Sequence, residues 1–483
     1  MAAQAPTVPG SAVPLCVDLD GTLIRTDLLW ESLVRLLKRN PLWLVVLPFW
    51  WWRGRAVLKR QIAARVEVDP ATLPYHAAFL DFLRAQKAAG RVLVLATASD
   101  AKLARRVAEH VGIFDDVLAS DGATNLRGAA KLAKLTGRFG VRGFDYAGNS
   151  AVDLAVWQQA RGAIVVNAPA GLARRAARLA QVNDRFCHAN STVVEVLRAM
   201  RPYQWVKNLI IFVPLLTSHQ LANLPLVFKA LWAFAAFCLC ASAVYVLNDL
   251  LDLEADRRHP AKRRRPFAAG DLPLPVGLGL VPLLLALGLG LAAALSPGFL
   301  GVVLLYLLLT TAYSCRLKQV ALLDVFVLAG LYTLRLIAGH EATQVAYSAW
   351  LLMFSMFLFL SLALVKRFVE VASLRRQNQS ATHGRGYLAR DWELVASLGA
   401  GSGYLAVLVL ALYVTSQEVR TLYRQPTLLL LVCPLLLYWI SRVWLIAHRG
   451  EMHEDPVVFA LKDRVSYLIG LLTLAVIWLA TGH

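Results

Sequence analysis

The fold is decided by the stretch Asn248-Asp249-Leu250-Leu251-Asp252-Leu253-Glu254-Ala255-Asp256. On a helix its three aspartates, which are spaced three and four residues apart, would share one face. They follow directly on the apolar run 227–247, which is long enough to cross a bilayer. Because clustered carboxylates repel one another, the motif predicts a bound divalent cation, and Mg²⁺ held by few carboxylates commonly brings phosphates with it.

A basic run comes next, from His259-Pro260 through Lys262-Arg263-Arg264-Arg265 to Pro266. Guanidinium and ammonium groups bind phosphate oxygens well. A solvated, charged loop is the alternative interpretation, and the regular spacing of acids before a basic cluster argues against it. The two runs together predict a site for a magnesium-bound, phosphorylated substrate at the end of a membrane helix.

Composition indicates a membrane protein with a strongly basic charge balance. The chain has 483 residues, of which 58% are hydrophobic, and its net charge is +19. This balance favours anionic lipid surfaces or phosphorylated substrates. Nucleic acid fits less well, because the charges are spread over short loops. The six cysteines have no paired spacing, so we expect reduced thiols and no zinc site.

Four motifs in the first third of the chain combine acids, a hydroxyl and a lysine in a pattern suited to phosphoryl transfer. One carboxylate of the first motif could attack phosphorus while the other acts as acid and base. The motifs are Asp18-Leu19-Asp20-Gly21-Thr22-Leu23, the strand 92–99 with Thr97, Lys131 after Leu126-Arg127-Gly128, and Tyr146-Ala147-Gly148-Asn149-Ser150-Ala151-Val152-Asp153.

This series resembles motifs I to IV of the haloacid dehalogenase (HAD) superfamily. The resemblance implies a doubly wound α/β domain over residues 12–182, with a helical cap at about 25–86. It also implies catalysis by Asp18 and Asp20, and phosphate binding by Thr97 and Lys131. The implied Mg²⁺ ligands are Asp18, Asp20, Asn149 and Asp153. Asn149 departs from the family, which has Asp there, so a degenerate domain that serves as a lid or docking module is the alternative.

The predicted cap holds the apolar run 41–55, which is too short to span a bilayer. Four tryptophans beside arginines are typical of the lipid interface. A buried cap core is the alternative, but so small a cap would hardly bury four indoles. We therefore expect the domain to lean on the membrane.

Apolar runs in the second half predict nine membrane spans. Residues 1–11 show no signal peptide and are expected to be disordered, and 183–205 is expected to be a connector into a membrane domain at 206–483. The spans lie at about 208–222, 227–247, 274–295, 298–314, 320–339, 346–365, 394–415, 426–446 and 464–481.

The charges between the spans predict an orientation. Loops after even-numbered spans carry almost all of the basic residues, whereas loops after odd-numbered spans carry only Arg420 and Arg424. This asymmetry places the even loops, the N-terminal domain and both sets of candidate active-site residues on the cytoplasmic side of an inner membrane. Within span five, Asp324 and Arg335 lie three turns apart, either as a mutual ion pair or as groups that face a functional interior.

The nine spans and the motif at the end of span two look like the UbiA superfamily of intramembrane prenyltransferases. The resemblance implies a helical bundle around a central cavity, with Mg²⁺ on Asp249, Asp252 and Asp256 and with Asn248 in support. Typical aromatic prenyltransferases carry a second aspartate-rich motif after span six. Here that loop begins Lys366-Arg367-Phe368-Val369-Glu370 and is basic.

Three further segments look like the branch that transfers phosphoribose to decaprenyl phosphate. They are Arg201-Pro202 to Lys207-Asn208, Tyr313-Ser314 to Asp324, and Asp455-Pro456 to Asp463-Arg464. The branch implies phosphoribosyl pyrophosphate and a polyprenyl phosphate as substrates, Mg²⁺ as cofactor, and a place in cell-envelope biosynthesis. The candidate substrate-binding residues are Lys207, Asn248, Arg265, Tyr313, Lys318, Lys366, Arg367, Lys462 and Arg464.

These expectations define a bifunctional membrane enzyme. The membrane half would make a phosphoribosyl lipid, and the HAD-like half would remove its 5-phosphate. The alternative is a prenyltransferase that uses a prenyl diphosphate and an aromatic or other acceptor, with a degenerate HAD domain for docking. Lys462 and Arg464 could equally be membrane anchors. Chain length of the lipid and oligomeric state do not follow from the residues.

Overall fold

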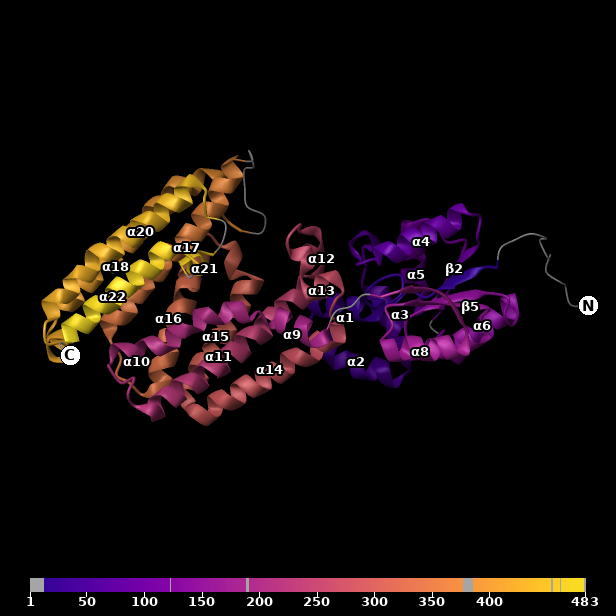
Figure 1. Ribbon diagram of the computed structural model, residues 1–483, viewed down its shortest axis with the longest axis horizontal. Coiled ribbons are helices and arrows are strands. Elements are labelled where there is room, and N and C mark those ends of the chain that lie inside the picture. The colour runs from indigo at the N-terminus through magenta and orange to yellow at the C-terminus, as the bar shows by residue number, and fades with distance from the viewer. Residues whose placement is uncertain are drawn as a thin grey trace, which may run out of the picture. The chain divides into compact units, whose positions relative to one another are not determined.

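The chain forms two compact units (Figure 1). The computed structural model describes residues 13–121, 123–187, 191–376, 385–452, 455–460 and 462–481, so the predicted disordered N-terminus lies outside the described residues. The first unit comprises Met1–Met200 and Tyr245–Pro282, and the second comprises Arg201–Val244 and Leu283–His483. The loop that carries the aspartate motif therefore belongs to the same unit as the N-terminal α/β domain.

A six-stranded parallel sheet forms the centre of the first unit, with strand order β3-β2-β1-β4-β5-β6. This order confirms the doubly wound α/β fold, and its crossover point between β1 and β4 is where such sheets bind ligands. The strands are β1 (Leu15–Val17), β2 (Leu93–Asp100), β3 (Asp116–Ser120), β4 (Asp145–Gly148), β5 (Gly162–Val166) and β6 (Gln181–Phe186).

Helices cover both faces of the sheet because its central strands are apolar on both sides. Leu15 and Val17 of β1 belong to one hydrophobic core, and Cys16 between them belongs to the other. The first core receives the cap helices α1 (Leu28–Arg39), α3 (Arg55–Arg65) and α4 (Ala77–Ala88) together with α5 (Ala101–Val111). The second receives α6 (Ala129–Phe139), α7 (Leu154–Gln159) and α8 (Ala170–Leu179).

Strand β6 was not expected from the sequence. It lies at the edge of the sheet, pairs with β5, and crosses the predicted domain boundary at residue 182. Its sequence, Gln181-Val182-Asn183-Asp184-Arg185-Phe186, is mostly polar and exposed, as edge strands often are. It therefore lacks the apolar run that identifies a buried strand. Helix α9 (Thr192–Met200) follows and completes the connection.

The tryptophan-rich run forms helix α2 (Trp43–Trp52), and it divides between burial and exposure. Trp43 and Trp50 pack on each other with ring centroids 5.3 Å apart. Trp52 is 84% exposed, and Trp51 is also exposed. The cap thus buries Trp50, half-buries Trp43 and leaves the other two indoles on its surface.

Eight helical segments of the described residues are long and apolar enough to cross a membrane, which identifies a multi-pass membrane protein. They agree with eight of the nine predicted spans. They are α11 (Leu224–Leu251), α14 (Leu274–Leu295), α15 (Pro297–Cys315), α16 (Leu323–Thr343), α17 (Ala349–Arg376), Ala389–Thr415 with α18 (Trp392–Thr415), Pro426–Arg449 with α20 (Val432–Arg449), and α22 (Arg464–Thr481).

The first predicted span, 208–222, is not among these eight helices. This part of the chain forms a 3₁₀ helix, η3 (Pro202–Phe212), followed by the short helix α10 (Val213–Thr217). Trp205 donates to Ser242, Asn208 donates to Cys238, and the ring of Phe212 lies on that of Phe234, so η3 runs antiparallel beside α11. With a rise of about 2.0 Å per residue in η3 and about 1.5 Å in α10, the two helices together are about 30 Å long, which is close to the thickness of the hydrocarbon core of a bilayer.

In the second unit, a charged cluster joins α16 to α17. Asp324 pairs with Arg367, with Nε and Oδ2 2.7 Å apart, and both side chains are buried. Tyr387 donates its hydroxyl proton to Asp324 at 2.6 Å, and Glu370 also pairs with Arg367. One of the two predictions for Asp324 was an ion pair with Arg335. It is wrong, because Asp324 pairs with Arg367 of the neighbouring helix α17.

We predict that Arg367→Met destabilises the protein, because it leaves Asp324 buried without its cation. Removal of one partner of a buried pair costs about 3–5 kcal/mol. Denaturant-induced unfolding in detergent micelles measures the loss. Arg390→Met, at an exposed position, is the matched control. An Arg367→Met variant as stable as this control would contradict the structural role.

Candidate active sites

The first candidate site lies at the carboxyl end of β1, where Asp18 and Asp20 follow the strand. Lys131 at the start of α6 donates to Asp18 Oδ1 at 2.9 Å. Asp20 accepts from the hydroxyl of Ser99 at 2.6 Å and from that of Thr97 at 3.5 Å. The structure therefore brings together the predicted residues of motifs I, II and III.

The two carboxyl groups differ from ordinary aspartates in their acidity. Burial raises the pKa of Asp18 to about 7, against the opposing effect of the Lys131 ammonium. Burial also raises the pKa of Asp20 to about 6, and the nearby Asp27 carboxylate adds to this rise. A carboxyl group with a pKa near neutrality can deliver and accept a proton at physiological pH, as an acid/base catalyst must.

Asp153, a predicted Mg²⁺ ligand, is held in place by four hydrogen bonds. Its Oδ1 accepts from the Tyr146 hydroxyl at 3.0 Å. Its Oδ2 accepts from the backbone of Asn149 and from the backbone and hydroxyl of Ser150, at 2.9–3.1 Å. Three of these four hydrogen bonds fall on Oδ2 and one on Oδ1, so Oδ1 keeps a lone pair that a metal ion or its water shell could use. Asp153 therefore organises the motif IV loop.

Asp18, Asp20, Asn149 and Asp153 are the groups predicted to hold Mg²⁺ at this site. A side chain on Gly21 would collide with the Asn149 amide, so Asn149 lies directly against the motif I loop. Carboxylate and amide oxygens are ligands that Mg²⁺ accepts. When bound, the ion would neutralise a phosphoryl group beside Asp18.

Two residues of this site were missed by the sequence reasoning. The Tyr146 hydroxyl accepts from Lys131 at 2.8 Å and so links Asp153 to the lysine that holds Asp18. Lys59 of α3 donates to the Ala98 carbonyl at 2.6 Å and to Asn125 at 3.1 Å. Burial lowers the pKa of Lys59. Tyr146 stands inside motif IV and could have been noticed, whereas nothing in the sequence marks Lys59.

The second candidate site is the aspartate motif, which is not one continuous helix. Helix α11 ends at Leu251, and Asp252 leaves helical geometry before the short helix α12 (Leu253–Arg258) begins. Asp249 and Asp256 are buried and both accept from Arg265 Nη1, at 3.0 Å and 2.6 Å. Asp252 is exposed and pairs with Lys38 of α1 at 3.4 Å.

This geometry suits a cation at two of the three aspartates. Asp249 and Asp256 converge on one guanidinium nitrogen, so the same two carboxylates could hold a divalent cation. When bound there, Mg²⁺ would neutralise a diphosphate leaving group. No cluster of three or more metal-ligating side chains is already assembled within the described part of the chain. Asn248 is half-buried beside the pair.

In the second unit, Asp455 gathers two of the predicted phosphate-binding lysines. Lys207 and Lys366 donate to Asp455 Oδ2 at 3.1 Å and 3.2 Å. Burial alone would raise the pKa of Asp455, but the two ammonium groups hold it below its usual value. Asp455 was quoted only as part of a family segment, so its role as the common partner was missed.

The other predicted cationic and aromatic residues of this unit are placed differently. Arg367 is fully buried and donates to the Tyr313 hydroxyl at 3.3 Å, so both are engaged inside the helix cluster. Lys318 is half-buried, and Lys462 and Arg464 are exposed. Arg335 donates to Asn208 at 2.8 Å and lies over the ring of Tyr306 at 5.1 Å.

Comparison with known proteins agrees with this architecture. The UbiA prenyltransferase family matches residues 210–480, and a haloacid dehalogenase-like hydrolase model matches residues 15–165. An uncharacterized protein of Sinorhizobium fredii, y4nM, is 40% identical over 464 residues, which are 95% of this chain and 89% of that protein. Nodulation protein NoeC of Azorhizobium caulinodans is 38% identical, over 57% of this chain and 90% of its own.

A third relative is named for its reaction. The decaprenyl-phosphate phosphoribosyltransferase of Mycobacterium tuberculosis is 34% identical over 216 residues, which are 42% of this chain and 71% of that protein. The matches cover both the α/β domain and the membrane helices. This chain belongs to the UbiA prenyltransferase family and carries a HAD-like domain ahead of its membrane helices.

Proposed function

We propose that this protein transfers 5-phosphoribose from phosphoribosyl pyrophosphate to a polyprenyl phosphate. The observation that carries the proposal is the pairing of both Lys207 and Lys366 with Asp455. Lys366 begins the predicted loop after span six, where typical aromatic prenyltransferases carry a second aspartate-rich motif, so this chain has positive charge where those enzymes have acids. The relative named as a decaprenyl-phosphate phosphoribosyltransferase supports the same substrates.

The residues divide the work of this transfer. Asp249 and Asp256, with Asp252, would hold Mg²⁺, which would supply the charge that neutralises the departing pyrophosphate. When the substrate binds, the Arg265 guanidinium exchanges its ion pairs with these carboxylates for hydrogen bonds to the pyrophosphate oxygens. The C1–O bond to pyrophosphate breaks, and an oxygen of the lipid phosphate forms the new bond to C1. That oxygen is already anionic, so no general base is needed.

Lys207 and Lys366 bind the remaining phosphate groups. Each holds an ammonium at about 3 Å from Asp455, and a phosphate dianion would compete with that single carboxylate for both. Arg367 is left out of this role because its guanidinium is fully buried among Asp324, Glu370 and Tyr313.

We also propose that the HAD-like domain removes the 5-phosphate of the lipid product. Asp18 attacks the phosphorus, the bond from phosphorus to the ribose 5-oxygen breaks, and Asp20 protonates that oxygen as it leaves, while Lys131 neutralises the phosphoryl oxygens. Water then hydrolyses the aspartyl phosphate, which releases phosphate and regenerates Asp18. The contacts of Lys131 with Asp18 and of Ser99 with Asp20 support these roles. The transferase product is a phosphomonoester, which is the substrate class that this chemistry requires.

Helix α2 supports a membrane position for this domain. Leu42, Val45 and Trp52 are each more than 70% exposed. Arg53 lies over the ring of Phe49 and Arg55 over that of Trp51, at 5.7 Å and 5.8 Å. Exposed indoles flanked by arginines fit the headgroup region of a bilayer. We propose that α2 rests on the cytoplasmic face of the inner membrane, on the side of the basic loops.

For the transferase we predict that the protein in nanodiscs incorporates label from phosphoribosyl pyrophosphate into polyprenyl phosphate when Mg²⁺ is present. Asp249→Ala should lower incorporation at least about 100-fold, the loss typical of removing one charge-stabilising group. Asp81→Ala, on the exposed face of α4, is the control. No label with this donor, together with turnover of a prenyl diphosphate, would establish the alternative prenyltransferase function.

For the phosphatase we predict that the wild type releases phosphate from the phosphoribosyl lipid. Asp18→Asn should reduce release at least about 1000-fold because the nucleophile is removed, while phosphoribosyl transfer continues. Mass spectrometry of the extracted lipid measures whether the 5-phosphate is retained, and Asp81→Asn is the control. A wild type that leaves the 5-phosphate in place would contradict this role and favour a docking function for the domain.

A further inference from the structure

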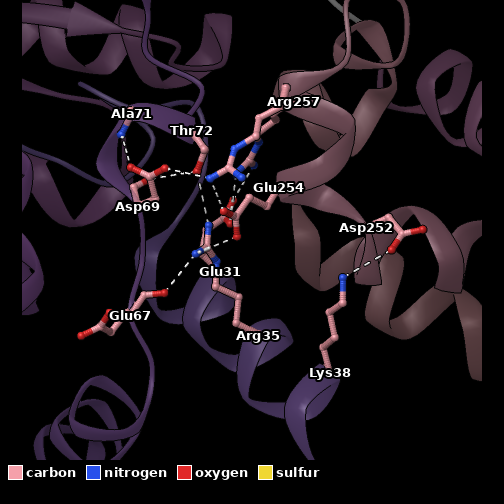
Figure 2. Close-up of polar contacts among 11 residues, drawn as sticks. Glu31, Arg35, Lys38, Glu67, Asp69, Ala71, Thr72, Asp252, Glu254 and Arg257 are labelled. Atoms are coloured by element: carbon pink, nitrogen blue, oxygen red, sulfur yellow. Dashed lines mark hydrogen bonds and ion pairs between the residues drawn. The ribbon is translucent and has the colours of Figure 1, made fainter. Parts of the chain in front are cut away.

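A buried ion pair joins the HAD-like domain to the loop of the aspartate motif (Figure 2). Arg257 of α12 donates to both carboxylate oxygens of Glu31 in α1, at 2.6 Å and 3.1 Å. The Glu31 side chain is 0% exposed and that of Arg257 is 6% exposed. Thr26 donates to Glu31 at 2.9 Å, and Arg257 also donates to the Ala268 carbonyl at 2.9 Å.

Further complementary charges surround this pair. Arg35 and Lys38 of α1 face Glu254 and Asp252 across the contact, at 3.4 Å in each case (Figure 2). Arg258 reaches Asp69 in the loop before α4, at 3.1 Å. Four charged pairs, including the buried one, thus connect the cap to residues 252–258.

An apolar contact lies beside the charges. Val34 of α1 packs in one hydrophobic core with Leu250, Leu253 and Phe267. Gly270 has φ +74° and lies so close to Arg25 that an added Cβ would be 2.8 Å from the Arg25 carbonyl oxygen. The contact between the cap and this loop is therefore packed as closely as a domain interior.

Helix α1 also begins at the first candidate site. Asp27 caps its amino end, and the backbone N–H of Leu28 donates to Asp20 at 2.9 Å. The same helix therefore touches the acid/base residue of the HAD-like site and, one turn later, the arginine next to Asp256.

We propose that the HAD-like domain is a positioning element of the transferase, and that α1 fixes Asp256 through Glu31 and Arg257. The inference rests on the proposed phosphoribosyl transfer. Helix α12 has six residues, too few to be stable without packing. Glu31 is a positioning residue, because it acts on the motif through Arg257.

The test uses the full chain in nanodiscs with the variant Glu31→Gln, which keeps the side-chain shape and removes the charge. Glu67→Gln is the matched control, since Glu67 lies in the same domain with an exposed side chain (Figure 2). Hydrogen exchange of backbone amides in 253–269 reports the order of the loop without reference to activity. Steady-state kinetics report KM for each substrate separately.

We expect Glu31→Gln to accelerate exchange in 253–269 while exchange in β1 and β2 stays unchanged. KM for phosphoribosyl pyrophosphate should rise at least about ten-fold, as when an outer-shell partner of a metal ligand is lost, with KM for polyprenyl phosphate unchanged. Arg257→Gln should have the same effects. In the double variant the KM for phosphoribosyl pyrophosphate should rise no further than in Arg257→Gln alone, because the two substitutions remove the same interaction.

Three outcomes would overturn the inference or separate it from the proposed reaction. Exchange and KM equal to those of Glu67→Gln would overturn it. A lower turnover with both KM values unchanged would also overturn it, since that result means a smaller folded fraction. If the wild type transfers no phosphoribose, the proposed reaction fails, and unchanged exchange in 253–269 of Glu31→Gln would still overturn the positioning contact.

Discussion

The interaction on which this structure depends is the pairing of each buried carboxylate with a cation from another segment. A carboxylate removed from water is unstable unless an opposite charge and hydrogen bonds replace its hydration. Lys131 meets Asp18, Arg265 meets Asp249 and Asp256, Arg257 meets Glu31, and Arg367 meets Asp324. The partners come from different helices or loops, so each pair also fixes how two segments pack. Two of the described carboxylates depart from this pattern. Four hydrogen bonds from Tyr146, Asn149 and Ser150 replace the cation at Asp153, and Glu195 pairs with Arg198 of its own helix.

This pairing explains what could be predicted from the sequence. The order of the HAD-like motifs predicts the meeting of Asp18, Asp20, Thr97 and Lys131, because the carboxyl ends of parallel strands lie at one edge of a sheet. Apolar length predicts eight of the spans. Cation partners are not predictable in this way, since a lysine or arginine side chain can reach any neighbouring segment. Asp324 takes Arg367 from the next helix although Arg335 has suitable spacing on its own helix. Strand β6 and helix η3 were missed because their residues carry no regular apolar period.

The aspartate motif shows how tertiary contacts change a local pattern. Spacings of three and four residues predict one helical face, yet the helix breaks at Asp252. Asp249 and Asp256 turn toward Arg265, while Asp252 turns toward Lys38 of the HAD-like domain. The negative charge of the motif is thus neutralised partly by the basic run that follows it and partly by a lysine of the HAD-like domain. The spacing of the motif predicts a shared face, but the cations that neutralise its carboxylates come from tertiary contacts that the spacing does not predict.

The same electrostatic argument bears on Asn149. Burial already raises the pKa of Asp18 to about 7, and Lys131 is the cation that opposes this rise. A second carboxylate at position 149 would lie against the motif I loop and raise the pKa of Asp18 further. That would reduce the ionised fraction of Asp18. The neutral amide keeps an oxygen that could bind a metal and omits the repulsion. Asparagine at this position is therefore compatible with an ionised Asp18 and does not by itself mark a degenerate domain.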